Sequence, residues 1–250
     1  MGEPADLARL RREIALACRV LAHEGLAADV LGHVSVRIGT DAMLIRCRGP
    51  QERGLLFTEP GDVHIVGLGG PATLPPGYSA PTELPIHAET LRARPEVAAV
   101  VHAHPPGVVT ANIAGLPLRP VIGAYNIPAM RMASEGIPVY PRGVLIRRAD
   151  LAAEMLAAMG DAPVCVLRGH GVTTTGASIA EATIRALNME ALARIILSAA
   201  QAGGRPAELP PAYIAELPDL GATLNTENVW RYHLARLAHA GLGLPESPMP

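Results

Sequence analysis

The sequence predicts an α/β fold, a single domain built around one mixed sheet. Segments with the two-residue alternation of β-strands and segments with helical spacing follow one another throughout the 250 residues. No internal repeat and no linker divides the sequence into independent halves. Hydrophobic residues make up 49% of the chain and charged residues 18%, which is the balance of a globular domain rather than of a disordered chain.

The first third of the chain predicts a helix followed by strands. Residues 5–24 carry apolar side chains at helical spacing, so we expect an amphipathic helix. Residues 31–38 then alternate, which puts His33, Ser35 and Arg37 on one face of a strand. The segments expected to follow are a strand at 42–48 that forms a hairpin with it, a short extended piece at 55–57, a strand at 63–68 and a loop rich in Gly and Pro at 69–80.

The remaining elements are marked by caps and breakers. Thr82 is a favourable N-cap and Pro85 is tolerated in a first turn, so a helix is expected to begin there with Glu83 in its first turn. Ser178 and Glu181 form a capping-box pattern that opens a long helix. The other expected segments are a strand at 97–104, a helix at 106–114, an irregular stretch at 117–146, a helix capped by Asp150 and ending at Gly160, a strand at 164–167 and a helix at 226–240.

Charge and cysteine content limit the functional classes. A net charge of −2 gives no electrostatic reason to expect nucleic acid or a membrane surface as a partner. No apolar run has the length that spans a bilayer, and the first six residues lack the basic and then apolar order of a signal peptide. Cys18, Cys47 and Cys165 are few, odd in number and widely spaced, which is typical of reduced thiols. We therefore expect a cytoplasmic protein.

The sequence contains no lysine, so all 21 basic residues are arginine. A Schiff-base mechanism, including one that uses pyridoxal phosphate, needs a lysine amine and is excluded. A phosphate-binding loop of the Walker type is excluded for the same reason. Any carbanion that this protein stabilises therefore needs another electron sink, for which a metal ion is the obvious candidate.

Three histidines form a candidate metal site. His102 and His104 follow an apolar run, and the alternation of a strand places both on one side, although two surface histidines at a strand edge would give the same pattern. His170 lies between two glycines directly after an apolar strand, where it is either a ligand or a turn residue without a role. Together they predict a three-histidine site with open positions for substrate. Imidazole ligands leave Zn, Mn, Fe and Co open as the metal.

The order of four motifs resembles the class II aldolase/adducin family from about residue 8 to residue 200. These motifs are Gly32-x-Val34-Ser35-x-Arg37, Thr82-Glu83-x-x-x-His87, Val101-His102-Ala103-His104-Pro105 and Arg168-Gly169-His170-Gly171. The resemblance implies a three-layer α/β/α fold with a mainly antiparallel sheet, over one domain of residues 1–250 with a helical extension from about residue 205. It also implies that His102, His104 and His170 bind a divalent metal and that Glu83 is the general acid/base. A homotetramer with active sites at subunit interfaces is implied as well.

The sequence departs from the sugar-phosphate members of that family at their phosphate subsite. Those members carry Gly-Asn where this chain has Gly32-His33, and a Ser-Ser pair where it has Pro81-Thr82. Less specific motifs resemble a branch of the same family that decarboxylates hydroxylated aromatic acids such as dihydroxyphthalate. They are Arg46-Cys47-Arg48-Gly49-Pro50, Gly123-Ala124-Tyr125, Tyr140-Pro141-Arg142 and Leu167-Arg168-Gly169-His170-Gly171.

That branch implies a small-molecule substrate and a set of substrate-binding residues. A second ring carboxylate would be held by an arginine, whose planar fork matches two oxygens. The candidates, each of which is otherwise an exposed ion-pair partner, are Arg37, Arg48, Arg142 and Arg168. His33 and Thr82 occupy the former phosphate subsite and are expected to contact the substrate. Tyr232 and His233 are expected to reach a neighbouring site, with interface packing as the alternative.

Two other functions remain open from the sequence. An aldolase or epimerase acting on a hydroxy-aldehyde or sugar would keep the metal, Glu83 and the fold, and would differ only in the substrate pocket. A non-catalytic adducin-like interaction module would be expected to lose its ligands, which the retention of all three histidines and Glu83 disfavours.

Overall fold

The computed structural model describes residues 5–69 and 73–245 and shows one central sheet of seven strands. The strand order is β3-β2-β1-β4-β7-β6-β5. Neighbouring strands are antiparallel except β5 and β6, which are parallel. The strands are β1 (His33–Ile38), β2 (Ala42–Arg46), β3 (Val63–Gly67), β4 (Ala99–Ala103), β5 (Val139–Tyr140), β6 (Val164–Leu167) and β7 (Gly171–Gly176).

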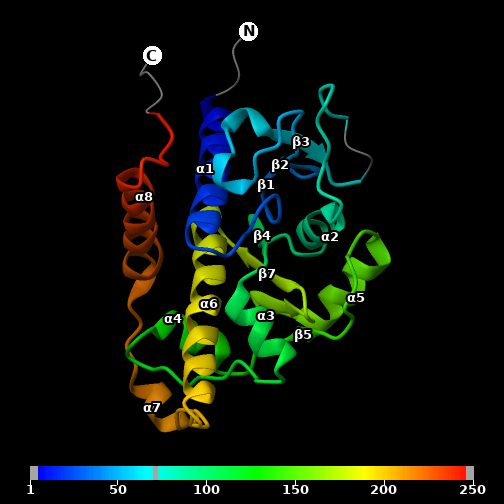
Figure 1. The fold of residues 1–250 in the computed structure, drawn as a ribbon. Coiled ribbons are helices and arrows are strands. Elements are labelled where there is room, and N and C mark those ends of the chain that lie inside the picture. The colour runs from blue at the N-terminus through cyan, green and yellow to red at the C-terminus, as the bar shows by residue number, and fades with distance from the viewer. Residues whose placement is uncertain (1–4, 70–72, 246–250) are drawn as a thin grey trace.

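Helices cover both faces of this sheet, as Figure 1 shows. On one face lie α1 (Ala5–His23), α3 (Pro106–Ile113), α4 (Ile127–Ala133) and α6 (Ile179–Gln201). On the other lie α2 (Leu84–Ala93) and α5 (Ala149–Met159). Side chains of β4 alternate between the two cores, since Val101 packs on the α1 and α6 side and Val100 on the α2 and α5 side. The predicted three-layer α/β/α fold with a mainly antiparallel sheet is confirmed.

Three segments differ from the sequence-based expectation. The strand β7 was not predicted, because its Thr-rich core lies between glycines; it is buried between β4 and β6. Residues 55–57 form a 3-10 turn rather than an extended piece, since the backbone N–H and the hydroxyl of Thr58 both bond to the Leu55 carbonyl. The stretch 117–146 is not irregular throughout, because it contains α4 and β5. Asn126 caps α4 by accepting a hydrogen bond from the N–H of Ala129.

Two predicted helix caps are wrong and one is right. Thr82 does not cap α2; Glu83 occupies the N-cap position, with its side chain directed elsewhere. Asp150 lies inside the first turn of α5, which Arg148 precedes as N-cap. Ser178 caps α6 and accepts a hydrogen bond from the N–H of Glu181, as predicted.

The carboxyl-terminal part adds α7 (Pro211–Glu216) and α8 (Val229–His239), the latter preceded by a π-helical turn, Thr223–Asn228. Figure 1 shows α8 running beside α1 and α6. Residues 70–72 of the predicted loop at 69–80 lie outside the described part of the chain. Residues 1–4, which belong to the start of the chain where no signal peptide is expected, also lie outside it. Within the described residues, none of the helices combines the length and the apolar character needed to cross a bilayer.

Candidate metal and substrate site

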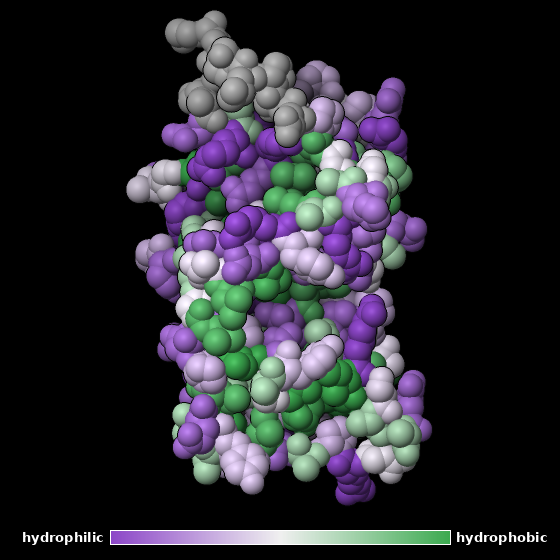
Figure 2. All heavy atoms as spheres, turned by 90° about the vertical axis from the view of Figure 1, so that its left-hand side faces the viewer, coloured by the Kyte–Doolittle hydropathy of each residue, from purple (hydrophilic) through white to green (hydrophobic). Residues whose placement is uncertain are grey.

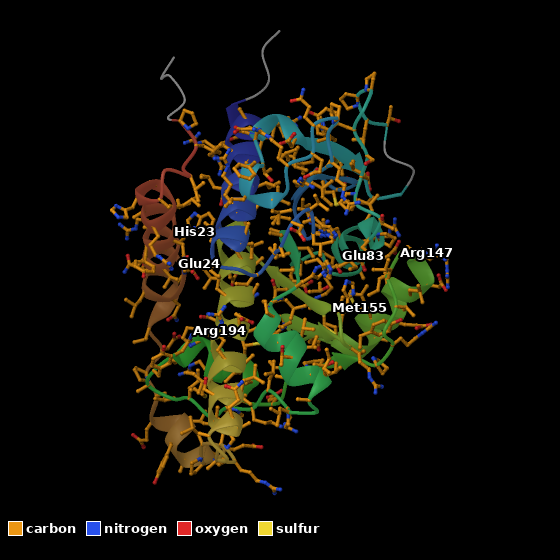
Figure 3. The ribbon with its side chains drawn as sticks, viewed as in Figure 1. His23, Glu24, Glu83, Arg147, Met155 and Arg194 are labelled. Atoms are coloured by element: carbon orange, nitrogen blue, oxygen red, sulfur yellow. The ribbon has the colours of Figure 1, made fainter. Side chains whose placement is uncertain are left out.

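Four side chains from three parts of the fold converge at the end of β4. His102 is in β4, His104 follows its last residue, His170 lies in the turn between β6 and β7, and Glu83 precedes α2. One ligand atom from each lies within 4.8 Å of all the others. The Nε2 atoms of His102 and His104 are 2.9 Å apart, and Oε2 of Glu83 lies 3.4 Å from Nε2 of His102 and 3.5 Å from Nε2 of His170. Figure 3 labels Glu83 beside α2, which it precedes as the N-cap residue.

The hydrogen bonds around this cluster leave its ligand atoms available to a cation. Nδ1 of His102 lies 3.0 Å from the carbonyl of Val172, so Nδ1 carries the hydrogen and Nε2 offers a lone pair. Oε1 of Glu83 accepts the N–H of Ile146 at 3.0 Å, which leaves Oε2 for the cluster. Three imidazole nitrogens and one carboxylate oxygen are ligands that suit a divalent transition metal. The residues present therefore fit such an ion.

Burial sets the protonation of these groups. It lowers the pKa of His104 to about 3, with a further contribution from His102, and it also lowers the pKa of His170. Both imidazoles are therefore neutral near pH 7, the form that binds metals. Burial alone would raise the pKa of Glu83, but hydrogen bonding to His102, favourable electrostatic interaction with the imidazoles of His102 and His170, and the N–H of Ile146 lower it to about 2. Glu83 is therefore an ionised carboxylate.

Two glycines allow the turn that carries His170. Gly169 has a φ of +62°, a left-handed conformation, and its N–H donates to Oδ1 of Asn112 in α3 at 2.8 Å. A Cβ on Gly171 would lie 2.3 Å from the carbonyl oxygen of Ala103 and 2.8 Å from the ring of His104. A larger residue at 171 would therefore push β7 away from β4 and separate the two ligands.

A cavity of about 680 Å³ opens beside the cluster. Its polar wall contains Glu83, His104 and His170 together with His33, Arg48 and Thr82. Its other wall is largely apolar and is formed by Leu31, Pro106, Val109 and Leu145. The cavity thus brings the candidate metal ligands, the guanidinium of Arg48 and apolar side chains together around one space.

Three of the predicted substrate-binding residues, His33, Arg48 and Thr82, therefore lie at this cavity. The other candidate arginines bond elsewhere. Arg37 donates to backbone carbonyls at the end of α2, Arg142 pairs with Glu154, and Arg168 lies 3.4 Å from the Pro141 carbonyl. Arg48 alone among the four lines the cavity.

Tyr232 and His233 do not lie at this cavity. They line a second cavity, of about 480 Å³, beneath the start of α8. Nδ1 of His233 is 3.1 Å from Oε1 of Glu24, and Arg236 bonds to both oxygens of the same carboxylate. Figure 3 shows Glu24 at the end of α1, on the side where α8 lies, and Figure 2 shows a hollow with a polar floor and apolar borders on that face. The two residues thus lie away from the candidate metal cluster of the same chain.

The sequence did not reveal the contacts of two parts of the site. His87, expected to be structural or to support a site residue, joins Ser35 to His33 through its ring, with Ser35 Oγ 2.6 Å from Nδ1 and His33 Nδ1 2.7 Å from Nε2. The shared polar face of His33 and Ser35 was visible in the strand alternation and is the signal that pointed to it. The apolar lining by Leu31 and Leu145 was not predicted. Leu31 was expected in the strand at 31–38 but lies before β1, and Leu145 lies in a loop.

Comparison with known proteins agrees with this geometry. The chain is 56% identical over 241 residues to 3,4-dihydroxyphthalate decarboxylase of Arthrobacter keyseri, which covers 95% of this chain and 97% of that protein. The protein of the same description from Rhodococcus jostii is 45% identical over 237 residues, covering 93% and 98%.

Solved structures show the same fold. An aldolase II superfamily protein from Pseudomonas syringae superposes with a TM-score of 0.80 over 96% of each chain, at 21% identity. L-Fuculose-1-phosphate aldolase from Thermus thermophilus superposes with a TM-score of 0.65 over 80% of this chain and 99% of that one, at 28% identity. Residues 12–197 match the family described as the Class II Aldolase and Adducin N-terminal domain. The chain therefore belongs to the class II aldolase and adducin family.

Proposed function

We propose that this protein is a metal-dependent decarboxylase of a hydroxylated aromatic acid, with 3,4-dihydroxyphthalate as its substrate. The observation that carries the proposal is the 56% identity, over 95% of the chain, to a protein described as 3,4-dihydroxyphthalate decarboxylase. The cavity supports it independently. Its apolar wall suits the faces of an aromatic ring, and Arg48 suits a ring carboxylate.

Loss of CO₂ from an aromatic ring leaves an electron pair on the ring carbon, which must be delocalised and then protonated. A divalent metal held by His102, His104 and His170 would supply Lewis-acid stabilisation of the negative charge on substrate oxygens. Because Glu83 is ionised, it first takes a proton from a ring hydroxyl. The protonated Glu83 then gives that proton to the ring carbon as the bond to CO₂ breaks. Water restores the hydroxyl proton, so that one carboxylate is replaced by one hydrogen.

Arg48 and the apolar wall orient the ring for this step. A phthalate has two carboxylates, and the one that stays is bound by the guanidinium of Arg48, which carries two parallel donors. Thr82 adds a hydroxyl on the same polar wall, and Leu31 and Leu145 pack against the ring.

We further infer that the metal is Zn, Mn, Fe or Co, and that the chain forms one domain with a carboxyl-terminal extension from about residue 205. The assembly is a cytoplasmic homotetramer with active sites at subunit interfaces. The large open cavity and the solvent-exposed Tyr232 support an interface that completes the site. Three buried thiols, without a disulfide, are consistent with a reducing compartment.

The test combines product and metal analysis. Purified protein incubated with 3,4-dihydroxyphthalate should release one CO₂ per substrate, and a chelator should abolish the release. His102→Ala should lose the bound divalent ion, whereas the exposed histidine variant His239→Ala should retain both metal and activity. Retro-aldol cleavage of a hydroxy-aldehyde, with no CO₂ from any acid, would establish an aldolase instead. Unchanged metal content in His102→Ala would refute the metal site.

A further inference from the structure

A chain of three polar side chains runs from the interior of the sheet to the wall of the cavity. Ser35 Oγ lies 2.6 Å from Nδ1 of His87, and Nε2 of His87 lies 2.7 Å from Nδ1 of His33. Ser35 and His87 are completely buried, while His33 lines the cavity together with Arg48. The proposed proton transfers require neither Ser35 nor His87, so their alignment needs another explanation.

The hydroxyl of Ser35 fixes the direction of these hydrogen bonds. In the described part of the chain, Ser35 Oγ has no hydrogen-bond partner besides Nδ1 of His87. If that nitrogen carried the hydrogen, the hydroxyl hydrogen would be buried without an acceptor, which costs about 1–3 kcal/mol. The hydroxyl therefore donates and Nδ1 of His87 accepts. A neutral imidazole has one N–H, so His87 carries it on Nε2 and donates it to His33.

The same reasoning assigns the hydrogen of His33. Because Nδ1 of His33 accepts from His87, its own hydrogen is on Nε2. Among the described residues, Nε2 has no protein partner, and it is not one of the buried atoms that lack one, so it is open to the cavity. Burial keeps both imidazoles neutral; it lowers the pKa of His87 to about 3 and that of His33 well below its ordinary value.

We propose that Ser35 and His87 are positioning residues that hold His33 as the Nε2–H tautomer, so that His33 donates a hydrogen bond to the substrate carboxylate that Arg48 also binds. An ionised carboxylate only accepts hydrogen bonds, so this tautomer attracts it, whereas a lone pair on Nε2 would repel it. Arg48 lies near enough that its charge contributes to the lowered pKa of His33. The assignment of a substrate carboxylate as the acceptor rests on the proposed function, whereas the assignment of the His33 tautomer does not.

The first experiment measures the tautomers directly. Nitrogen spectra of the Zn²⁺-loaded protein, labelled with ¹⁵N-histidine, distinguish protonated from unprotonated ring nitrogens, and His33→Gln and His87→Gln assign the two rings. We expect a protonated Nε2 and an unprotonated Nδ1 in both. Ser35→Ala removes the donor to His87, so both rings should become tautomer mixtures. Protonated Nδ1 in the wild-type protein, or unchanged spectra in Ser35→Ala, would overturn the proposal.

The second experiment measures the consequence for substrate binding. A hydrogen bond to the carboxylate that stays is present in both ground and transition states, so its weakening changes KM rather than kcat. Ser35→Ala should raise KM for 3,4-dihydroxyphthalate roughly 3- to 10-fold with kcat nearly unchanged. Thr183→Val removes another fully buried hydroxyl, bonded to Ile179 in α6 away from the cavity, and should change neither constant.

The two proposals fail in different ways. If the wild-type protein does not decarboxylate 3,4-dihydroxyphthalate but shows the expected tautomers, the proposed function and the carboxylate contact are refuted and the positioning role of Ser35 stands. If turnover occurs and Ser35→Ala leaves KM unchanged, the positioning role is refuted and the function stands. If KM rises equally in Thr183→Val and Ser35→Ala, the cause is a general loss of packing in the protein core. That result would also refute the positioning role.

Discussion

Glu83 illustrates how a single residue acquires its role from contacts far along the chain. It occupies the N-cap position of α2 but does not cap the helix with its side chain. Its carboxylate instead accepts the N–H of Ile146 and faces His102 and His170. The backbone position was predictable from the helix start, whereas the direction of the side chain depends on a segment that lies 63 residues away in sequence.

Replacing Glu83 by Gln should separate catalysis from metal binding. The amide oxygen still accepts the N–H of Ile146, but the side chain can no longer take and give a proton. We expect kcat to fall by roughly 10²–10⁴-fold, the usual contribution of a general acid/base, while the three histidines keep the metal. Steady-state kinetics and metal analysis check this, with Glu89→Gln, a partly exposed residue of α2 paired with Arg92, as control. Wild-type kcat in Glu83→Gln would remove Glu83 from the mechanism.

The three cysteines should be unreactive in the native protein. Cys18, Cys47 and Cys165 are buried, and burial raises their thiol pKa values to about 12, 12 and 11. A raised pKa lowers the fraction of thiolate, which is the reactive form, at every pH below it. A thiol reagent at pH 8 should therefore modify none of them in the folded protein and three per chain after denaturation. Rapid labelling of the native protein would contradict their burial.

At the scale of secondary structure, the site depends on how elements are joined rather than on their individual propensities. β4 lies between β1 and β7, which places His33 opposite His102 across the ladder. The turn before β7 brings His170 to the same end, and Asn112 of α3 holds that turn through Gly169. The positions of the candidate metal ligands therefore depend on the register of β1, β4 and β7 and on the contact of the turn with α3.

Glu190 of α6 should stabilise the start of α3, just beyond His104. Its buried carboxylate accepts the N–H groups of Gly107 and Val108, which are unpaired donors of the first turn of α3. Glu190→Ala, which leaves both N–H groups without this acceptor, should lower the free energy of unfolding by about 1–2 kcal/mol, the size of a lost helix cap, as measured by urea denaturation. Glu89→Ala, which removes a partly exposed ion pair with Arg92, should change it by less than about 0.5 kcal/mol. Equal effects of the two variants would refute this capping role.

At the scale of the whole molecule, the carboxyl-terminal segment keeps Tyr232 and His233 away from the histidine cluster of the same chain. Tyr232 lies in α8 and is 59% exposed, and the adjacent His233 bonds to Glu24, the residue that follows α1. In the proposed tetramer, such an exposed side chain is available to a neighbouring subunit. The site would then combine Glu83 of one chain with Tyr232 of another.

Subunit mixing tests this arrangement. Light scattering should give the mass of four 26.1 kDa chains, and Tyr232→Phe should lower activity without loss of metal. Because a shared site needs Glu83 and Tyr232 from different chains, co-expressed Glu83→Gln and Tyr232→Phe subunits should form some intact sites. Their mixture should be more active than the mean of the two variants measured separately, which is the value expected if each site belongs to one chain. A monomer, or a mixture without any gain, would rule out the shared site.

The sequence by itself determined which residues form the candidate metal site, and most of the helices and strands. His102 and His104 were readable because strand alternation is local, and His170 because the glycines around it permit a tight turn. The α/β class, the helix at Ser178 and the absence of a lysine-dependent mechanism also follow from local patterns or composition. Such features are encoded within a few residues, so no long-range contact is needed to infer them.

Only the tertiary structure decided which other residues share that site. The sequence could not distinguish Arg48 from three other candidate arginines. In the structure Arg48 lines the cavity, whereas Arg37, Arg142 and Arg168 bond elsewhere. The chain from Ser35 through His87 to His33 joins β1 to α2, and β7 is a strand because its neighbours pair with it. The choice of Arg48, the Ser35–His87–His33 contacts and the strand β7 all arise from contact between segments distant in sequence, which local propensity does not encode.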